Sequence, residues 1–257
     1  MKYITSPDNS FYKELGKLAN SARQRRKAGQ TLLDGAHLLA AYLDTGKIPL
    51  HLVVTEAAQN DVEISAILKK LPEVPITQLD NALFAELSEL KTVSGLLALI
   101  TVPQLEVQPQ HAKFCLLLEN TQDPGNVGSM LRSAAAAGCD AVFMSQGCAD
   151  AWSPKVLRAA MGGHFLLAIY EDADLLQVAS AFPGKVFAAA LGAKTSIFAS
   201  TLGGRIAFAM GNEGAGLSDA LLAKSIPVAI PMPGKVESLN AAAAAAICLF
   251  EAVRQRS

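Results

Sequence analysis

Two patterns of hydrophobic residues recur along this chain. Apolar residues spaced three or four positions apart are typical of helices, and short continuous apolar runs are typical of buried strands. Between residues 11 and 27, apolar residues recur every three or four positions, which predicts one long helix. Further strands are expected at 31–33, 51–55 and 96–102, and further helices at 36–43 and 62–71. The first hundred residues are therefore predicted to form a small α/β domain.

Beyond residue 113, short apolar runs alternate regularly with helical patterns. The expected strands cover 114–118, 141–144, 167–170, 185–190, 206–210 and 228–230, and the expected helices cover 127–137, 154–160, 173–181, 218–224 and 239–254. Strands that are apolar throughout are typical of parallel sheets buried on both faces. The predicted fold class is α/β, with a mostly parallel sheet covered by helices and a smaller N-terminal α/β domain.

The two parts are joined by a stretch with no helical period, TVPQLEVQPQHAK, which contains two prolines and three glutamines. It indicates a linker at 103–112, with one domain at 1–102 and the other at 113–257.

Three expected strands are followed by loops rich in glycine and polar residues. The loops read E-N-T-Q-D-P-G-N-V-G-S-M-L-R (119–132), M-G-N-E-G-A-G-L-S (210–218) and I-P-M-P-G-K-V-E-S-L-N (230–240). In open parallel sheets, ligands bind beyond the carboxyl ends of strands, so these loops are the candidate site. Asn126 suits the N-cap of a helix, and the guanidinium of Arg132 suits a phosphate group.

A purely structural interpretation exists for each loop taken alone. Asn126 and either Ser238 or Asn240 could cap helices, Arg132 could be solvated, and Glu213 could lie in a glycine-rich turn. This interpretation does not explain why all three loops follow strand ends of one expected sheet.

Several kinds of chemistry lack their sequence signature. The chain contains no G-x-G-x-x-G, G-x-x-x-x-G-K-[ST] or H-E-x-x-H motif, and its four cysteines form no C-x-x-C pair. We therefore expect no metal and no dinucleotide cofactor. Cys148, in a Gly-Cys-Ala-Asp loop, is the one cysteine expected to be exposed.

In order and spacing, the three loops resemble the signature motifs of the SpoU/TrmH family of RNA ribose methyltransferases, which belongs to the trefoil-knotted SPOUT class. The resemblance covers about 115–254, and residues 1–100 are more loosely similar to the RNA-binding domain attached to many members. It implies a deep trefoil knot near the C-terminal end, a homodimer, and S-adenosyl-L-methionine as the methyl donor. The chain departs from many members in the six alanines that follow Asn240.

For the site, the resemblance implies that backbone groups hold the cofactor and that polar side chains carry out the chemistry. The matching cofactor positions are Gly211, Ile230 and Leu239, and the matching catalytic positions are Asn126, Arg132, Glu213, Ser238 and Asn240. The family proposal makes the arginine a base, helped by a substrate phosphate. A positioning role, in which Arg132 clamps that phosphate, is the alternative we prefer, because a guanidinium stays protonated in proteins.

The chain carries 22 Lys plus Arg against 23 Asp plus Glu, a net charge of −1, which excludes a uniformly basic nucleic-acid binder. Local clusters are compatible with RNA binding. Arg23, Arg26 and Lys27 share one helix face, and Lys155 and Arg158 form a second pair three residues apart. We expect these five residues to contact RNA phosphates, although solvated helix ends would show the same pattern.

The N-terminal sequence lacks the apolar core of a signal peptide, and no apolar run reaches the roughly 18 residues of a membrane span. We therefore expect a cytoplasmic protein without a membrane partner. Ribosomal RNA is the favoured substrate, by analogy with other members that carry an extra N-terminal domain. The alternatives are a tRNA ribose methyltransferase and a non-catalytic RNA-binding protein on the same fold.

Overall fold

The computed structural model describes residues 2–88 and 93–256 and divides the chain into two compact units. Unit 1 comprises Met1–Pro103 and Trp152–Phe165, and unit 2 comprises Gln104–Ala151 and Leu166–Ser257. The first boundary falls at the expected linker. The segment Trp152–Phe165 packs with unit 1, although the sequence pattern places it within the second domain.

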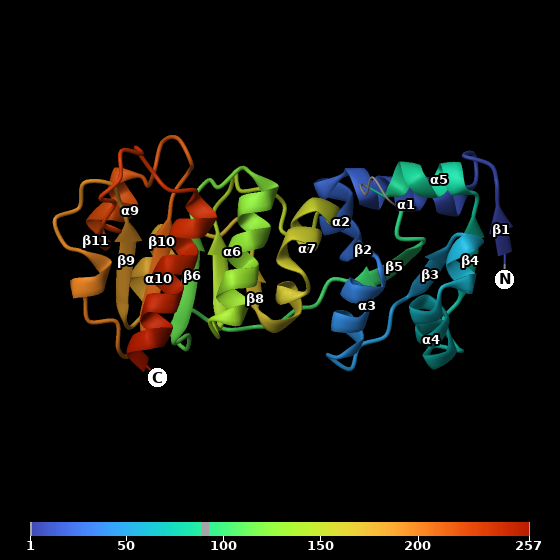
Figure 1. The fold of residues 1–257 in the computed structure, drawn as a ribbon, viewed down its shortest axis with the longest axis horizontal. Coiled ribbons are helices and arrows are strands. Elements are labelled where there is room, and N and C mark those ends of the chain that lie inside the picture. Colours follow the sequence, from blue (N-terminus) through green and yellow to red (C-terminus); the bar gives the residue numbers. More distant parts are fainter. Residues whose placement is uncertain (1, 89–92, 257) are drawn as a thin grey trace. The chain divides into compact units, whose positions relative to one another are not determined.

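Unit 1 is built on a mixed five-stranded sheet with the order β1-β4-β3-β5-β2 (Figure 1). Its strands are β1 (Lys2–Ile4), β2 (Gln30–Asp34), β3 (His51–Val54), β4 (Ile76–Leu79) and β5 (Leu96–Thr101). Its helices are α1 (Ser10–Asn20), α2 (Ala22–Ala28), α3 (Ala36–Leu43), η1 (Ala57–Asn60), α4 (Val62–Lys70), α5 (Asn81–Leu87) and α7 (Pro154–Ala160). The apolar faces of α1 and α5 meet the sheet in a core centred on Leu15 and Phe84, which have no exposed surface.

The prediction of one helix over residues 11–27 is wrong, because the segment forms two helices. Ser21 leaves the helical conformation (φ −135°, ψ 111°), and its side chain accepts a hydrogen bond from the Gln24 N–H at the start of α2. The buried guanidinium of Arg25 donates to the carbonyl oxygens of Leu18 and Ala19, which lie at the end of α1. Ser21 therefore acts as a cap, a position that serine prefers to a helix interior.

Unit 2 contains a six-stranded sheet in which every pairing is parallel, with the order β11-β9-β10-β6-β7-β8. Its strands are β6 (Phe114–Leu118), β7 (Ala141–Met144), β8 (Ala168–Tyr170), β9 (Lys185–Ala189), β10 (Ile206–Met210) and β11 (Ile226–Val228). Its helices are α6 (Pro124–Ala136), α8 (Leu175–Ala181), η3 (Ile197–Ala199), α9 (Asp219–Ala223) and α10 (Ala241–Arg256), and η2 (Gly163–Leu166) crosses the unit boundary. The predicted fold class, a parallel sheet covered by helices, is confirmed.

Helix α10 packs against α6, and Figure 1 shows the two helices next to each other over the sheet. Ala242 and Ala245 lie on the buried face of α10. Their methyl groups allow the close helix packing expected of the alanine run. Within the described residues, no helix has both the length and the apolar character that crossing a membrane requires.

The strand expected at 228–230 is placed two residues too late. Strand β11 pairs with β9 from Ile226 to Val228, and Ile230 lies beyond its end. This shift puts Ile230 in a loop, where its side chain is available to a ligand.

Candidate functional site

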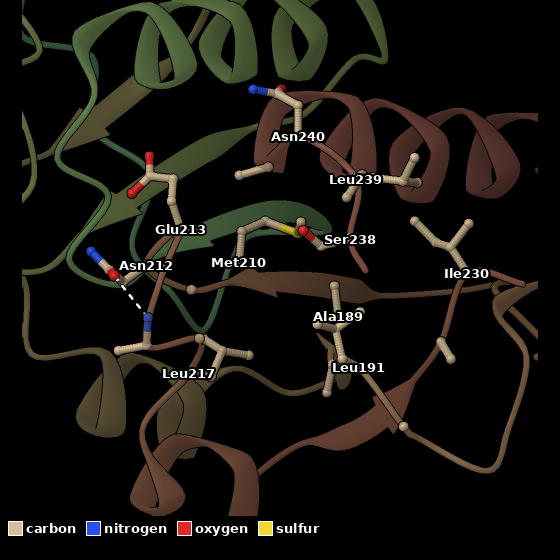
Figure 2. A pocket seen from close by; sticks show the side chains of 18 of the residues that line it. Ala189, Leu191, Met210, Asn212, Glu213, Leu217, Ile230, Ser238, Leu239 and Asn240 are labelled. Carbon is tan, nitrogen blue, oxygen red and sulfur yellow. Dashed lines mark hydrogen bonds between the residues drawn. The ribbon is translucent and has the colours of Figure 1, made fainter. Parts of the chain in front are cut away.

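A cavity of about 620 Å³ opens at the carboxyl edge of the unit 2 sheet (Figure 2). Its walls come from the loops after β9, β10 and β11 and from the first residues of α10. Because all six strands are parallel, their carboxyl ends meet at this edge, where α/β proteins bind ligands. The volume lies within the usual range of small-molecule pockets.

One part of the cavity is apolar and rich in backbone groups. Gly211, Ile230 and Leu239, the three predicted cofactor positions, all line it. Ala189, Leu191, Met210 and Leu217 add further apolar surface, and Figure 2 shows Leu191 and Ile230 across the cavity from Glu213. Apolar walls with exposed main-chain N–H and C=O groups suit a flat heteroaromatic ring such as adenine.

The glycine-rich loop after β10 is folded closely on itself. A Cβ atom at Gly211 would lie 2.2 Å from the carbonyl carbon of Gly216. Asn212 and Gly216 exchange two backbone hydrogen bonds of 3.0 and 2.9 Å, and the Asn212 side chain accepts from the N–H groups of Gly214 and Ala215 (Figure 2). Only glycine at position 211 permits this close approach of two backbone segments.

A chain of three polar side chains joins the first turn of α6 and the loop after β10 to the start of α10. The Asn240 side-chain oxygen accepts from the N–H groups of Ala242 and Ala243, so its amide nitrogen faces the other way. That nitrogen donates to the Asn126 side-chain oxygen at 2.8 Å, and the Asn126 nitrogen donates to Oε1 of Glu213 at 3.0 Å. The helix end thus fixes the donor and acceptor direction of every bond in this amide relay (Asn240–Asn126–Glu213).

Glu213 ends the relay as an acceptor in its ionised form. Partial burial raises its pKa, but hydrogen bonds from the Asn126 side chain and from the backbone N–H groups of Glu213, Gln122 and Asp123 outweigh that effect. The net result is a pKa below the ordinary value of 4.5. The carboxylate therefore stays charged at neutral pH and holds the loop after β10 against the loop after β6.

The N-cap of α6 is Asp123 rather than Asn126, because Asp123 accepts from the Asn126 backbone N–H at 2.7 Å. Asn126 lies in the first turn of the helix, which leaves its side-chain amide free to take part in the relay. Asn240, in contrast, does cap α10 through its side-chain oxygen. Its amide nitrogen takes part in the relay, so this residue has both the capping role and a role in the site.

The remaining two predicted catalytic residues make fewer contacts. Ser238 lines the cavity with an exposed side chain. Arg132 lies on the third turn of α6, is exposed, and does not line the cavity. Neither side chain forms a hydrogen bond or an ion pair with any residue in the described ranges 2–88 and 93–256, so both can bind an external group.

Sequence reasoning missed two polar residues that join the loops and one wall of the cavity. Glu119 accepts from the backbone N–H and the hydroxyl of Ser218, both at 2.7 Å, and Asn212 donates to the carbonyl of Asn120 at 2.8 Å. The loop after β9, with Leu191, forms the missed wall. The polar residues were visible in the motifs, but the wall depends on β9 lying between β10 and β11, and chain order does not reveal this neighbour relation.

The five predicted RNA-binding residues all belong to unit 1. Arg23, Arg26 and Lys27 are exposed on α2, and Lys155 and Arg158 are exposed on α7. The domain bounds expected from the sequence place the α7 pair in the second domain, whereas the structure groups it with the unit that carries α2.

Metal and thiol chemistry receive no structural support from the described residues. They contain no cluster of three or more His, Cys, Asp or Glu side chains that could hold a metal ion. Cys148 is half-buried rather than exposed, its thiol contacts the Leu118 carbonyl oxygen at 3.3 Å, and burial raises its pKa.

Comparison with known proteins agrees with this geometry. Residues 113–250 match the model of the SpoU rRNA Methylase family. The 23S rRNA (guanosine(2553)-2'-O)-methyltransferase RlmP of Bacillus subtilis is 32% identical over 97% of this chain and 98% of its own. A crystal structure of an RNA 2'-O ribose methyltransferase superposes with a TM-score of 0.84 and 30% identity, covering 99% of both chains. The SpoU methyltransferase AviRb of Streptomyces viridochromogenes, solved with AdoMet, superposes with a TM-score of 0.84 and 26% identity over 96% of this chain and 98% of its own.

Proposed function

Because this chain belongs to the SpoU rRNA methylase family, we propose that it transfers a methyl group from S-adenosyl-L-methionine to a ribose 2'-OH in RNA. The observation that carries the proposal is the meeting of an apolar, backbone-rich cavity with the amide relay at one sheet edge. We favour ribosomal RNA over tRNA as the substrate, because the relative RlmP, which matches over nearly the whole chain, is a 23S rRNA methyltransferase.

The cavity fits the proposed cofactor in size and chemistry. The space left by Gly211 and the apolar side chains of Ile230 and Leu239 would hold the adenosine part, and main-chain groups would recognise the base. When bound, the sulfonium of the cofactor supplies the electrophilic methyl group. The protein's own task is to hold the cofactor, to orient the ribose hydroxyl and to exclude competing water.

The polar residues divide this task according to their contacts. The amide relay fixes the first turn of α6, the loop after β10 and the start of α10, so that the cavity keeps one shape. Ser238 offers a hydroxyl at the cavity wall, within the part of the site that receives the ribose. Arg132, which has no partner among the described residues, clamps the RNA phosphate next to the reacting ribose.

The proposal also includes the assembly and location implied by the resemblance. We infer a homodimer, a deep trefoil knot in unit 2 and action in the cytoplasm. Size-exclusion chromatography with light scattering tests the dimer: a mass of twice 26.9 kDa supports it, and a monomer mass contradicts it.

The reaction is tested with tritiated S-adenosyl-L-methionine and unmodified transcripts of ribosomal RNA and of tRNA. We expect label in ribosomal RNA and none in tRNA. Label in tRNA alone would support the alternative tRNA methyltransferase, and label in neither, with the cofactor bound, would refute methyl transfer to these RNAs.

A non-catalytic RNA-binding protein on the same fold is the second candidate. Isothermal titration calorimetry with S-adenosyl-L-methionine separates the two, since a non-catalytic protein has no need of the cofactor. We expect saturable binding, and no heat at millimolar ligand would favour the non-catalytic candidate. Asn126→Ala, which breaks the amide relay at its centre, should weaken the binding, whereas Gln177→Ala on the exposed side of α8 should not.

A further inference from the structure

One residue, Glu119 at the carboxyl end of β6, is bonded to both ends of the glycine-rich loop after β10 (210–218). Its backbone N–H donates to the carbonyl oxygen of Met210 at 2.9 Å, which continues the pairing of β6 with β10 up to the start of the loop. Its side chain accepts two hydrogen bonds of 2.7 Å from Ser218, one from the backbone N–H and one from the hydroxyl. Glu119 therefore joins the residue where the chain leaves the sheet to the residue where it enters α9.

The Ser218 hydroxyl is held in one orientation by these bonds. As the N-cap of α9 it accepts from the Leu221 N–H at 3.3 Å, and its single hydrogen goes to Oε1 of Glu119. A carboxylate accepts hydrogen bonds and does not donate them, so the direction of both bonds from Ser218 is fixed. Glu119 is half-buried, and bonds to a carboxylate are stronger than those between neutral groups.

The next residue, Asn120, supports the outgoing side of the same loop. Its carbonyl oxygen accepts from the Asn212 side chain at 2.8 Å, and its N–H donates to the Ser145 hydroxyl oxygen in the loop after β7 at 2.9 Å. Asn120 has a left-handed backbone (φ 52°), a conformation that asparagine adopts more readily than most residues. Two consecutive residues after β6 thus bond both sides of the glycine-rich loop.

The loop that these bonds close forms a whole wall of the cavity. Residues 211–217 all line the cavity, and Glu213 among them ends the amide relay. Three of these seven residues are glycines, which have more backbone freedom than other residues and need external bonds to hold one conformation. Glu119 itself does not line the cavity, so any effect that it has on a ligand passes through the loop.

We propose that Glu119 is a positioning residue for cofactor binding. By closing the base of the glycine-rich loop, it keeps the wall formed by residues 211–217 in the conformation that receives the cofactor. The proposal rests on the proposed function for the identity of the ligand. Glu119 acts through its two hydrogen bonds to Ser218, and its negative charge is not required for this role.

Hydrogen–deuterium exchange without any ligand tests the closure of the loop. The N–H groups of residues 214–216 are all bonded to Asn212, so their exchange reports on opening of the loop. We expect Glu119→Ala to raise these exchange rates several-fold. Rates equal to those of the original protein would overturn the closure by Glu119.

Asp140→Ala is the matched control for the loss of a carboxylate. Asp140 is half-buried like Glu119, and its carboxylate also accepts two hydrogen bonds, from the N–H groups of Lys113 and Phe114 at the amino end of β6. This variant should lower the thermal stability without changing exchange in the glycine-rich loop or cofactor binding. Equal losses of cofactor affinity in Asp140→Ala and Glu119→Ala would show a general loss of stability instead of positioning.

Calorimetry with S-adenosyl-L-methionine measures the consequence for the ligand. We expect Glu119→Ala to weaken binding roughly fivefold, which corresponds to a closed loop populated about a fifth of the time. The KM for the cofactor should rise by the same factor, and the KM for RNA should stay unchanged. Saturating cofactor should restore kcat, because the ligand selects the closed form.

Glu119→Gln separates hydrogen bonding from charge. The glutamine oxygen can accept from the Ser218 N–H, and its amide nitrogen can donate to the second lone pair of the Ser218 hydroxyl. We therefore expect cofactor affinity close to that of the original protein. A loss as large as that of Glu119→Ala would assign the effect to charge and overturn the positioning role.

Ser218→Ala completes a double-mutant cycle with Glu119→Ala. It removes one of the two bonds and keeps the backbone bond, so we expect a smaller loss of cofactor affinity. The combined variant should bind no more weakly than Glu119→Ala, because both changes act on one interaction. Additive losses would contradict this. Ser218→Ala also decides the question if Glu119→Ala does not fold.

Failure of the proposed function and failure of this inference give different results. An original protein that binds no S-adenosyl-L-methionine would refute the proposed function, and the cofactor role of Glu119 with it. An original protein that binds the cofactor with the same affinity as Glu119→Ala would refute the role of Glu119 alone.

Discussion

In unit 2 the functional side chains come from loops at one sheet edge and are fixed by bonds to one another, whereas in unit 1 the cations expected to bind RNA lie exposed on two helices, α2 and α7. The amide relay has a defined donor and acceptor at each atom. Arg23 and Lys27 on α2 and Arg158 on α7 are exposed, so their long side chains can adapt to a flexible polyanion. Methyl transfer needs the first kind of order, because small misplacements of reacting groups are costly, and RNA capture needs only the second.

Replacing Arg132 should give the largest difference between an effect on catalysis and an effect on RNA affinity. Arg132 is the one exposed cation on α6, the helix that also carries Asn126 of the relay. We predict that Arg132→Ala lowers kcat for methyl transfer by about 100-fold, the scale on which removal of one charge-stabilising group acts in active sites. The affinity for RNA should change little if, as the sequence predicts, cations outside the cavity contribute most of the RNA binding. Arg132→Lys should keep part of the activity through its charge. Near-normal turnover by Arg132→Ala would contradict an essential role.

Gly211→Ala tests the cofactor wall of unit 2. Its methyl group would lie within 2.2 to 2.5 Å of backbone atoms of Gly216 and Leu217, so the loop must open. We predict roughly a tenfold loss of S-adenosyl-L-methionine affinity by calorimetry, or about 1.4 kcal/mol, with the affinity for RNA unchanged. Gly203→Ala is the matched control, because nothing lies within 4 Å of its added carbon. Equal cofactor affinity in the two variants would argue against this wall.

Comparing Arg25 with Arg23 distinguishes the buried, structural cation of α2 from an exposed neighbour on the same helix. We predict that Arg25→Ala lowers the free energy of unfolding by about 2 kcal/mol, because removal of the buried guanidinium leaves two carbonyl oxygens without their donor. Urea denaturation measures the change. Arg23→Ala, on the exposed face of the same helix, should leave the unfolding free energy within about 0.5 kcal/mol of the original. If the two variants had equal stability, Arg25 would have no structural role.

The smallest predicted effect lies in α10, away from both functions. Hydrogen bonds from Arg254 and Gln255 lower the pKa of Glu251 to about 2 from 4.5. A lowered folded-state pKa means that the stabilisation is complete above about pH 4.5 and is lost as the pH falls toward 2. The difference in melting temperature between the original protein and Glu251→Gln should therefore be present at pH 7 and shrink below pH 4.5. A difference that grows on acidification would contradict this assignment.

The elements of unit 2 could be predicted more completely than those of unit 1, and for a physical reason. Buried parallel strands such as Phe114–Leu118 and Ile206–Met210 are continuous apolar runs, so their bounds can be read directly from the residue pattern. In unit 1, the short strands β1 (Lys2–Ile4) and β4 (Ile76–Leu79) and the helix α5 carry too little periodicity to be predicted. Their positions depend on pairing partners that are distant in sequence.

For single residues of the site, too, the sequence predicts local motifs but not the contacts that depend on tertiary packing. The motifs identified Asn126, Glu213 and Asn240, and the structure brings all three together in one relay. The sequence could not reveal that Asp123 takes the capping role, because two good capping residues lie three positions apart. The docking of Trp152–Phe165 on unit 1 also depends on tertiary packing and has no local pattern in the sequence.

The central claim, ribose methylation at the carboxyl edge of the unit 2 sheet, is tested most directly by identifying the product. An unmodified ribosomal RNA transcript is incubated with the protein and S-adenosyl-L-methionine, digested to nucleosides and studied by mass spectrometry. We predict one nucleoside carrying a methyl group on its ribose, formed about 100-fold more slowly when Arg132→Ala replaces the original protein. A methyl group on a base, or an equal initial rate with Arg132→Ala, would contradict the account.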